Sequence, residues 1–321
     1  MGARTEQSLI NEFRNTVHNR APLIRARAAG QRAFLEFRLS SARERNHSAI
    51  WWIHLAHLGT LDKLAGLLRR EGPYETLELL AIARNIFENL VWLRLMSNDH
   101  RYGLVFYSQL IRGQIDNLQG LITKISDEAD LFESVQELDD HALMSTVGEV
   151  IASEPSPEAI AEAQAAHRSR TDMLDDMVRR EFSLFSGPAT TNGYGYQAHL
   201  LRTKIIPKYQ EHLNEVTQHK AELDTVLPSL LDARMLNIAI NKWNWADRAK
   251  DAGMEKHYRF LYPYTSKLLH STPLNITSDK ALTEAETLIV LDYIVLSAGD
   301  LLDQIERFTY PGQINAIDLS S

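Results

Sequence analysis

The chain contains no cysteine among its 321 residues. Disulfide bonds, thiolate catalysis, iron–sulfur clusters and cysteine-bound zinc are therefore excluded. It also lacks any run of about 18 apolar residues, so no transmembrane helix is expected. The N-terminal segment has no apolar stretch typical of a secretory signal, and the start MGARTE has no Ser or Thr where myristoylation would need one. These absences predict a cytoplasmic protein without a membrane anchor.

Basic residues are fewer than acidic residues in this chain. The chain carries 34 Lys and Arg against 42 Asp and Glu, a formal net charge of -8. This balance argues against coating duplex DNA through bulk charge, but it leaves open a local basic groove or a compact RNA-cleaving site. Hydrophobic residues make up 44% of the chain, which is enough to bury a sizeable core. The length allows one large domain or two closely associated ones.

A strand pattern is missing as well. Apolar and polar residues do not alternate convincingly, whereas a 3.6-residue period runs through most of the chain. We therefore predict an all-α protein, a multi-helix bundle with a helical insertion. Residues 1–125 and 197–321 are expected to be the two halves of one bundle. Residues 126–196 are expected to form an acidic helical insertion that ends in a Gly-containing irregular loop, SGPATTNGYGY at 186–196.

Two opposite charges lie one helical turn apart in the most apolar segment, YETLELLAIARNIFENLVWLRLM. These are Arg84 and Glu88. A helix that is apolar nearly all round is buried, and charges within it must be paired. The pair has two interpretations at this point: an ion pair that stabilises the core, or two side chains that point into a pocket.

A polar stripe marks the segment KHYRFLYPYTSKLLH. Its members recur every four residues and so share one face of a helix: Tyr258, Tyr262, Ser266 and His270. We expect this stripe to face Arg84 and Glu88 across the bundle. Its hydroxyls and imidazole could satisfy the charges, or His270 could act as general base or acid while Arg84 holds a phosphate. Pro263 is expected to bend or restart the helix.

The two segments carry a resemblance. An R-x-x-x-E helix followed downstream by a Y-x-x-x-Y-x-x-x-S-x-x-x-H helix resembles a domain-of-unknown-function family of helical bacterial proteins. The matching stretches are about 45–125 and 235–305. This resemblance implies an all-helical fold and, because some members look like abortive-infection or defence proteins, a role in defence. It brings no settled activity.

A weaker resemblance is to the HEPN superfamily of helical ribonucleases and nucleotide-binding proteins. Its mark is an Arg followed four to six residues later by a His, and Arg94 and His100 in RLMSNDH fit that spacing. The polar residue that usually follows the Arg is Leu95 here. The resemblance implies a role for Arg94 and His100 in substrate binding.

Three further features have a structural and a functional interpretation. His54 and His57 at i, i+3 could bind metal if carboxylates converged on them, but two histidines at a helix interface explain the spacing better. Trp243 and Trp245 beside basic residues could stack on unpaired bases, or could be core or dimer contacts. The wide apolar face of VLDYIVLSAGDLLDQIERF predicts homodimer packing.

Two functions follow from these residues. The first is a metal-independent ribonuclease or nucleotide-acting toxin in bacterial defence, which would use the Arg/Glu/Tyr/Ser/His cleft on RNA or a nucleotide. The second is a non-catalytic helical sensor or interaction protein with a buried polar network. A homo-oligomer or a partner protein is expected in either case. No phosphate-cradling Gly-Lys-Ser/Thr loop occurs, and we expect neither a cofactor nor a metal ion; a di-metal helical oxidase, a third interpretation, would require bound metal.

Overall fold

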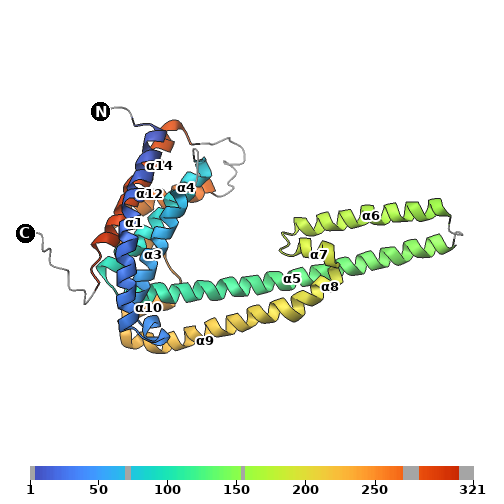
Figure 1. Ribbon diagram of the computed structural model, residues 1–321, viewed down its shortest axis with the longest axis horizontal. Helices are drawn as coiled ribbons and strands as arrows, with labels where there is room; N and C mark the ends of the chain where they lie inside the picture. The colour runs from blue at the N-terminus through green and yellow to red at the C-terminus, as the bar shows by residue number, and fades with distance from the viewer. Residues whose placement is uncertain (1–3, 69–73, 153–155, 270–281, 311–321) are drawn as a thin grey trace, which may run out of the picture. The chain divides into compact units, whose positions relative to one another are not determined.

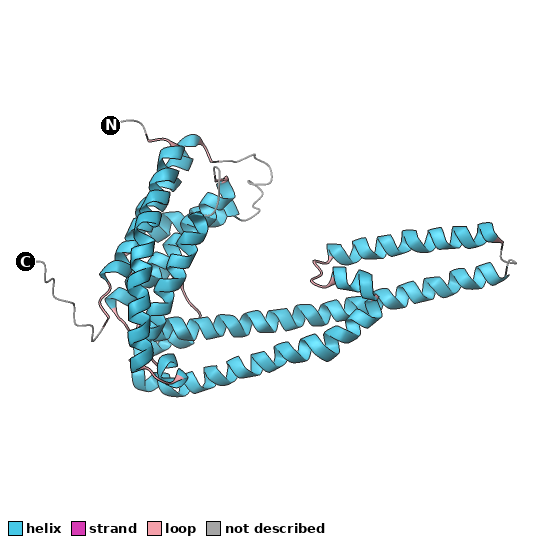
Figure 2. Cartoon of the chain, viewed as in Figure 1, coloured by secondary structure: helices cyan, strands magenta, loops and turns pink. Residues whose placement is uncertain are grey.

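The computed structural model describes residues 4–68, 74–152, 156–269 and 282–310. These ranges are almost entirely helical and contain no β-strand, which confirms the predicted all-α class (Figure 2). The helices (Figure 1) are α1 Glu6–Arg38, α2 Ala42–Asn46, α3 Ala49–Leu68, α4 Thr76–Asn98, α5 Tyr102–Ala152, α6 Pro157–Arg180, α7 Ser186–Asn192, α8 Tyr194–Leu200, the π-helical turn η1 Leu201–Ile205, α9 Ile206–Leu230, α10 Ala233–Ile240, α11 Trp245–Asp251, α12 Glu255–Leu269 and α14 Glu284–Arg307.

The chain divides into two compact units. The first unit comprises Met1–Gln109 and Leu223–Ser321, and the second comprises Leu110–Glu222. Helices α5 and α9 contribute residues to both units because each crosses a boundary. Residues 126–196, predicted to be a helical insertion, lie within the second unit. No helix in the described ranges has both the length and the apolarity that crossing a bilayer requires.

The first unit is a bundle in which α14 packs against α1 and α4, α3 packs against α1, and α12 packs against α4. The apolar residues of α14 that recur every three or four positions are buried here: Val290, Leu291, Ile294, Val295, Ala298, Leu301, Leu302 and Ile305. This face was expected to pair with a second copy of the chain. It packs within the first unit instead, because α1 and α4 present apolar stripes of their own to it.

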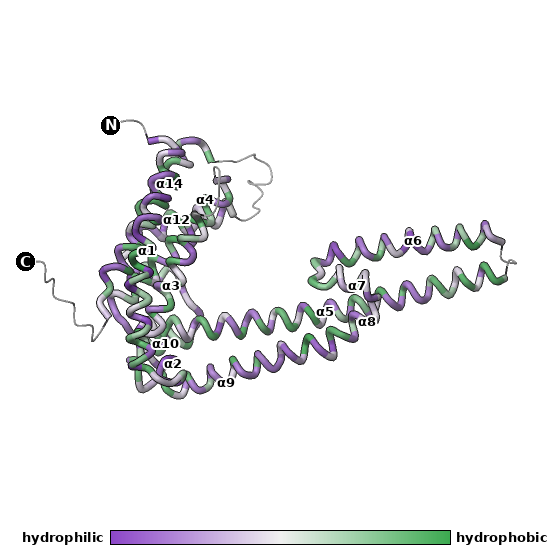
Figure 3. The backbone as a smooth tube through the Cα atoms, viewed as in Figure 1, coloured by the Kyte–Doolittle hydropathy of each residue, from purple (hydrophilic) through white to green (hydrophobic). Residues whose placement is uncertain are grey.

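The second unit is built on a helical hairpin of α5 and α6. Helix α5 runs for 51 residues. It continues well past the amphipathic pattern at its start. Figure 3 shows hydrophobic and hydrophilic positions alternating along α5, as a helix with one apolar face requires. The core of the unit gathers residues from α5 to η1: Ile125, Ala129, Phe132, Val135, Val178, Ala189, Tyr194, Ala198 and Leu201.

The irregular loop predicted at 186–196 is not present. Helices α7 and α8 occupy these residues and meet at Gly193, whose φ of 89° lies in the region that favours glycine. The buried carboxylate of Glu128 accepts the backbone N–H groups of Leu184 and Phe185, the two residues immediately before α7. The prediction of an irregular loop was wrong, and a contact from a distant helix such as this one leaves no mark in the local sequence.

Helix α12 runs unbroken through Pro263, which was expected to bend or restart it. The Thr265 hydroxyl donates to the carbonyl oxygen of Leu261 at 2.9 Å and lies 3.2 Å from that of Tyr262. The stripe from Tyr258 to Ser266 therefore lies on one continuous helix.

Candidate functional site

The polar site of the first unit lies where α12 packs on α4. Buried apolar residues on either side of Arg84, such as Ala83 and Phe87, fix the face that α4 turns to the core. Arg84 and Glu88 lie at the edge of that face. The side chain of each is 25% exposed, so the pair is half-buried and reachable from solvent.

Arg84 is bonded through all three of its nitrogens. Its Nε donates to Glu88 Oε1 at 3.0 Å. Its Nη1 donates to the hydroxyl of Ser266 at 3.1 Å, and its Nη2 donates to the hydroxyl of Tyr262 at 2.7 Å. We call Arg84, Glu88, Tyr262 and Ser266 the Arg84 network. The structure thus brings together four of the six residues predicted to form a polar cleft.

Aromatic rings extend the Arg84 network on the α12 side. The guanidinium carbon of Arg84 lies 4.3 Å from the centre of the Tyr262 ring, within cation–π distance. Tyr258 stacks on Tyr262 at 4.9 Å between ring centres and is 6.4 Å from the Phe87 ring. Tyr258 therefore supports the ring of Tyr262, and its contacts in the structure are aromatic.

The electrostatics of the site favour a protonated Tyr262. Burial raises the pKa of its hydroxyl, and the negative charge of Glu88 acts in the same direction, whereas the positive charge of Arg84 opposes both. The hydroxyl accepts from Arg84 and keeps its own proton for a further acceptor. Arg84 has five N–H groups, of which the three bonds engage three, so among the described residues two N–H groups are left for another acceptor.

His270, predicted as the acid or base of the cleft, lies outside the described residues. Arg94 and His100 were predicted to bind substrate, but their partners lie outside the Arg84 network. Arg94 Nη2 donates to Asp300 of α14 at 3.3 Å. The ring of His100 packs against Phe308, 5.1 Å between ring centres. The structure therefore joins neither residue to the Arg84 network.

Trp243 and Trp245 belong to an aromatic cluster. The Trp243 ring stacks on Trp92 at 3.8 Å and meets Trp245 edge to face at 5.7 Å. Trp92 in turn contacts Phe106 at 5.2 Å. One face of Trp243 is therefore covered by Trp92 of α4, as in the core-contact interpretation of this pair.

His54 and His57 lie in the core of the first unit, 0% and 1% exposed. The Nδ1 atoms of both lie near the hydroxyl of Tyr310, at 3.4 Å for His54 and 3.0 Å for His57. A hydroxyl can donate to one imidazole and accept from the other. Burial lowers the pKa of His54 to about 4 and that of His57 to about 3, so both are neutral at physiological pH.

The carboxylates that could have completed a metal site with His54 and His57 pair with arginines instead. Asp62 bonds Arg25, and Asp300 bonds Arg94. Asp292 and Asp303 likewise bond Arg4 and Arg20. Within the described ranges, no group of three or more His, Asp or Glu side chains converges as a metal site would require.

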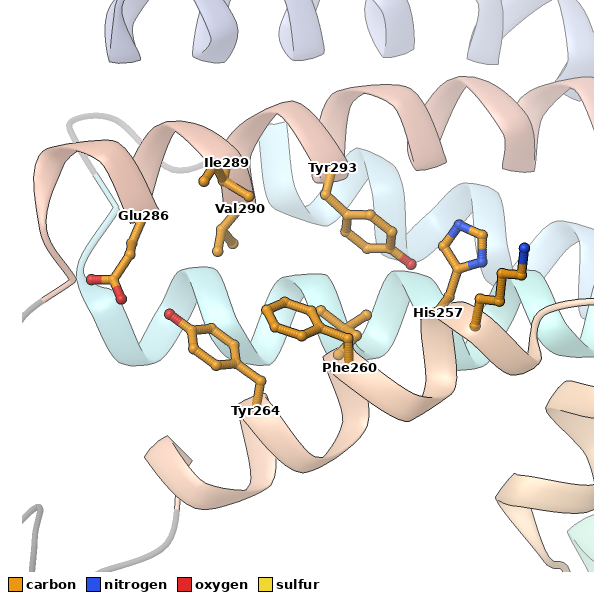
Figure 4. A pocket seen from close by; sticks show the side chains of 9 residues that line it. His257, Phe260, Tyr264, Glu286, Ile289, Val290 and Tyr293 are labelled. Atoms are coloured by element: carbon orange, nitrogen blue, oxygen red, sulfur yellow. The ribbon is translucent and has the colours of Figure 1, made fainter.

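A second feature of α12 was missed in the sequence. A cavity of about 510 Å³ opens between α12 and α14 (Figure 4), and Tyr258, Tyr262 and Ser266 of the polar stripe do not line it. Its lining is mostly apolar and aromatic: Lys256, His257, Phe260, Leu261, Tyr264, Glu286, Ile289, Val290 and Tyr293. The spacing of His257, Phe260 and Tyr264 was the available signal, because positions three and four apart share a helix face.

Comparison with known protein families, curated proteins and solved structures finds no match to this chain. The site is therefore interpreted from its own geometry. The resemblances drawn from the R-x-x-x-E and Y-x-x-x-Y-x-x-x-S-x-x-x-H segments stay predictions.

Proposed function

We propose that the protein is a helical sensor or interaction protein in which the Arg84 network holds α12 in one position against α4. The observation that supports this is the set of bonds from Arg84 to α12. Tyr262 and Ser266 lie one helical turn apart, so bonds to both oppose sliding as well as rotation of α12. A ligand or partner that prefers another position of α12 would act by shifting this contact.

Variants of two Arg–Glu pairs test this proposal. Arg84→Met removes the Arg84 network. Arg32→Met removes the Arg32–Glu36 pair of α1, which has the same i, i+4 spacing but exposed side chains, 51% and 46%. Hydrogen exchange measured by mass spectrometry should accelerate in α12 for Arg84→Met and stay unchanged there for Arg32→Met, because exposed pairs contribute little. Equal exchange in α12 for both variants and the parent protein would overturn the proposal.

A second candidate is a metal-independent ribonuclease or nucleotide-acting effector in bacterial defence. The partial exposure of Arg84 favours it, together with the two N–H groups that the network leaves for a phosphate oxygen. Under this proposal His270, four residues beyond Ser266 in sequence, serves as general base or acid. RNA or a nucleotide is then the substrate, and the cytoplasm is the site of action.

His270→Ala separates the two candidates. An effector should lose RNA cleavage or growth inhibition on this substitution while its circular dichroism and melting temperature stay close to the parent values. A sensor should show no turnover in the parent protein. A fully active His270→Ala protein would rule out the catalytic role of His270.

Both candidates include a protein partner. A second copy of the chain or a different protein would bind the first unit through surfaces other than the buried face of α14. Sedimentation velocity of the full chain measures the oligomeric state, and a monomer at every concentration would leave only a different protein as partner.

A further inference from the structure

The cavity between α12 and α14 has walls suited to a flat apolar body. Phe260 and Tyr264 stack on one another, 5.3 Å apart and 14° from parallel. Leu261 and Val290 form the floor, since they are 8% and 6% exposed. The rim is open, because Phe260 is 67% and Ile289 is 65% exposed. A cavity of about 510 Å³ lies within the range of small-molecule sites, roughly 300–1,000 Å³.

The two ends of the cavity differ in charge. At one end lie Lys256 and His257, and the ring of His257 lies 6.5 Å from that of Tyr293, centre to centre (Figure 4). Within the described ranges no carboxylate forms an ion pair with Lys256 or His257. Burial raises the pKa of Tyr293 to about 12, so its hydroxyl stays protonated, and the oxygen itself is buried. This end therefore offers donors and positive charge.

At the opposite end of the cavity the polar side chains already have hydrogen-bond partners. The hydroxyl of Tyr264 is hydrogen-bonded to Glu286, and the two side chains point toward one another in Figure 4. Glu286 also accepts from the backbone N–H of Thr283 at 2.9 Å as part of the cap of α14. Its negative charge would repel a second acid. The cavity is therefore polarised along its length.

We infer that this cavity binds a small aromatic acid, with its rings against Phe260, Tyr264 and Ile289 and its acidic group at Lys256 and His257. The span from His257 to Tyr264 is seven residues, about 10 Å along the helix axis, which suits a body of two fused rings. The ligand covers apolar surface that is otherwise exposed, and its charge complements the basic end.

This inference deepens the proposed sensor function. It rests on that function for the claim that the ligand acts through α12. Helix α12 turns one stripe, Tyr262 and Ser266, to Arg84 and another, Phe260 and Tyr264, to the cavity. A ligand in the cavity therefore touches the same helix that the Arg84 network positions. Occupancy of the cavity should change the exchange of α12 that Arg84 controls.

Isothermal titration calorimetry of the full chain with naphthalene-2-carboxylate tests the cavity. The uncharged 2-naphthamide has nearly the same shape and is the ligand control. We expect one site per chain and binding of the amide about tenfold weaker, as one lost charge-assisted contact implies. Lys256→Met should weaken carboxylate binding to the same extent and leave amide binding unchanged. Ile289→Trp, which fills the open rim, should abolish both.

Lys250→Met on α11, an exposed lysine outside the cavity lining, is the variant control and should bind like the parent protein. Circular dichroism checks that the variants fold; should Ile289→Trp not fold, Lys256→Met decides. No binding of the carboxylate, equal binding of carboxylate and amide, or binding unaffected by Lys256→Met would each overturn the inference.

The experiments distinguish an error in the proposed ligand site from an error in the proposed sensor function. If the carboxylate binds as expected but leaves hydrogen exchange of α12 unchanged, the site stands and the sensor function fails. If nothing binds while Arg84→Met still accelerates exchange in α12, the cavity fails and the role of the Arg84 network stands.

Discussion

The guanidinium of Arg84 contacts Tyr262 in two ways at once. Its Nη2 donates to the tyrosine hydroxyl at 2.7 Å, and its central carbon lies 4.3 Å from the centre of the same ring. A single residue of α12 therefore offers Arg84 both a hydrogen-bond acceptor and a π surface. The two contributions can be separated by substitution, since phenylalanine keeps the ring and loses the hydroxyl.

Tyr262→Phe should lower the free energy of unfolding of the first unit by about 1 kcal/mol, the usual contribution of one hydrogen bond. Tyr262→Leu should lower it by a further ~0.5–1 kcal/mol because the cation–π contact is lost as well. Urea unfolding followed by circular dichroism measures both values. In an Arg84→Met background the hydroxyl has lost its donor, so Tyr262→Phe should cost clearly less. Strict additivity of the two substitutions would contradict the pairing.

The buried histidines predict a loss of stability in acid. The pKa values of about 4 for His54 and about 3 for His57 lie below the value near 6.5 that an unfolded chain has. Between these values the unfolded state binds more protons than the folded state, so stability rises with pH and falls as pH drops from about 6.5 toward 4. The effect should be fully absent above pH 7.5.

His57→Asn should reduce the slope of unfolding free energy against pH in that window, because a group that titrates only in the unfolded state has been removed. Urea denaturation at pH 7.5, 6.5 and 5.5 measures the slope. His18→Asn, at an exposed position of α1, is the control and should retain the parent slope. An unchanged slope in His57→Asn would show that other groups cause the acid sensitivity.

The close approach of Arg84 to Tyr262 and Ser266 follows from sequence periodicity. Residues four apart lie on one face of a helix, and a half-buried charge in an apolar helix needs polar partners, so the two stripes were expected to face one another. The contact of His57 with Tyr310 was beyond this reasoning, because it joins residues 253 positions apart. No periodicity links a helix to a residue beyond the end of another helix.

The second unit shows a related limit. Residues 186–196 contain the glycines and proline of a typical loop, yet they form α7 and α8. The segment that leads into α7 is bonded to Glu128, which lies more than fifty residues earlier. Tertiary contacts of this kind override local propensity, and only the three-dimensional arrangement reveals them.

Gly103 allows α5 to begin against α3. A Cβ atom at this position would lie 2.1 Å from the carbonyl oxygen of Ala49, far inside contact distance with backbone that cannot rotate away. Gly103→Ala should therefore destabilise the first unit by about 1–3 kcal/mol, although alanine favours a helix over glycine.

Gly59→Ala in α3 is the matched control for that change. Nothing lies within 4 Å of a Cβ at Gly59, so this variant should be stabilised by roughly 0.5–1 kcal/mol. Thermal unfolding of the two variants measures the difference. A Gly103→Ala protein at least as stable as the parent would show that α3 and α5 can move apart without cost.

The role of Glu128 as a buried acceptor can be tested by replacing one of its carboxylate oxygens. Its side chain is 1% exposed. One carboxylate oxygen accepts from the hydroxyl of Ser183 and from the N–H of Phe185, and the other accepts from the N–H of Leu184 at 3.0 Å. Glu128→Gln replaces one acceptor oxygen with an NH₂ group that faces donors, so a buried donor loses its partner.

This substitution should cost the second unit about 2–4 kcal/mol and increase hydrogen exchange across 183–192, because the segment that leads into α7 loses a buried acceptor. Glu137→Gln, at an exposed position of the same helix, should change neither quantity. Differential scanning calorimetry together with exchange by mass spectrometry measures both. If Glu128→Gln unfolds like Glu137→Gln, then packing of Ala189 and Tyr194 into the core is sufficient to hold α7 and α8, and the carboxylate is dispensable.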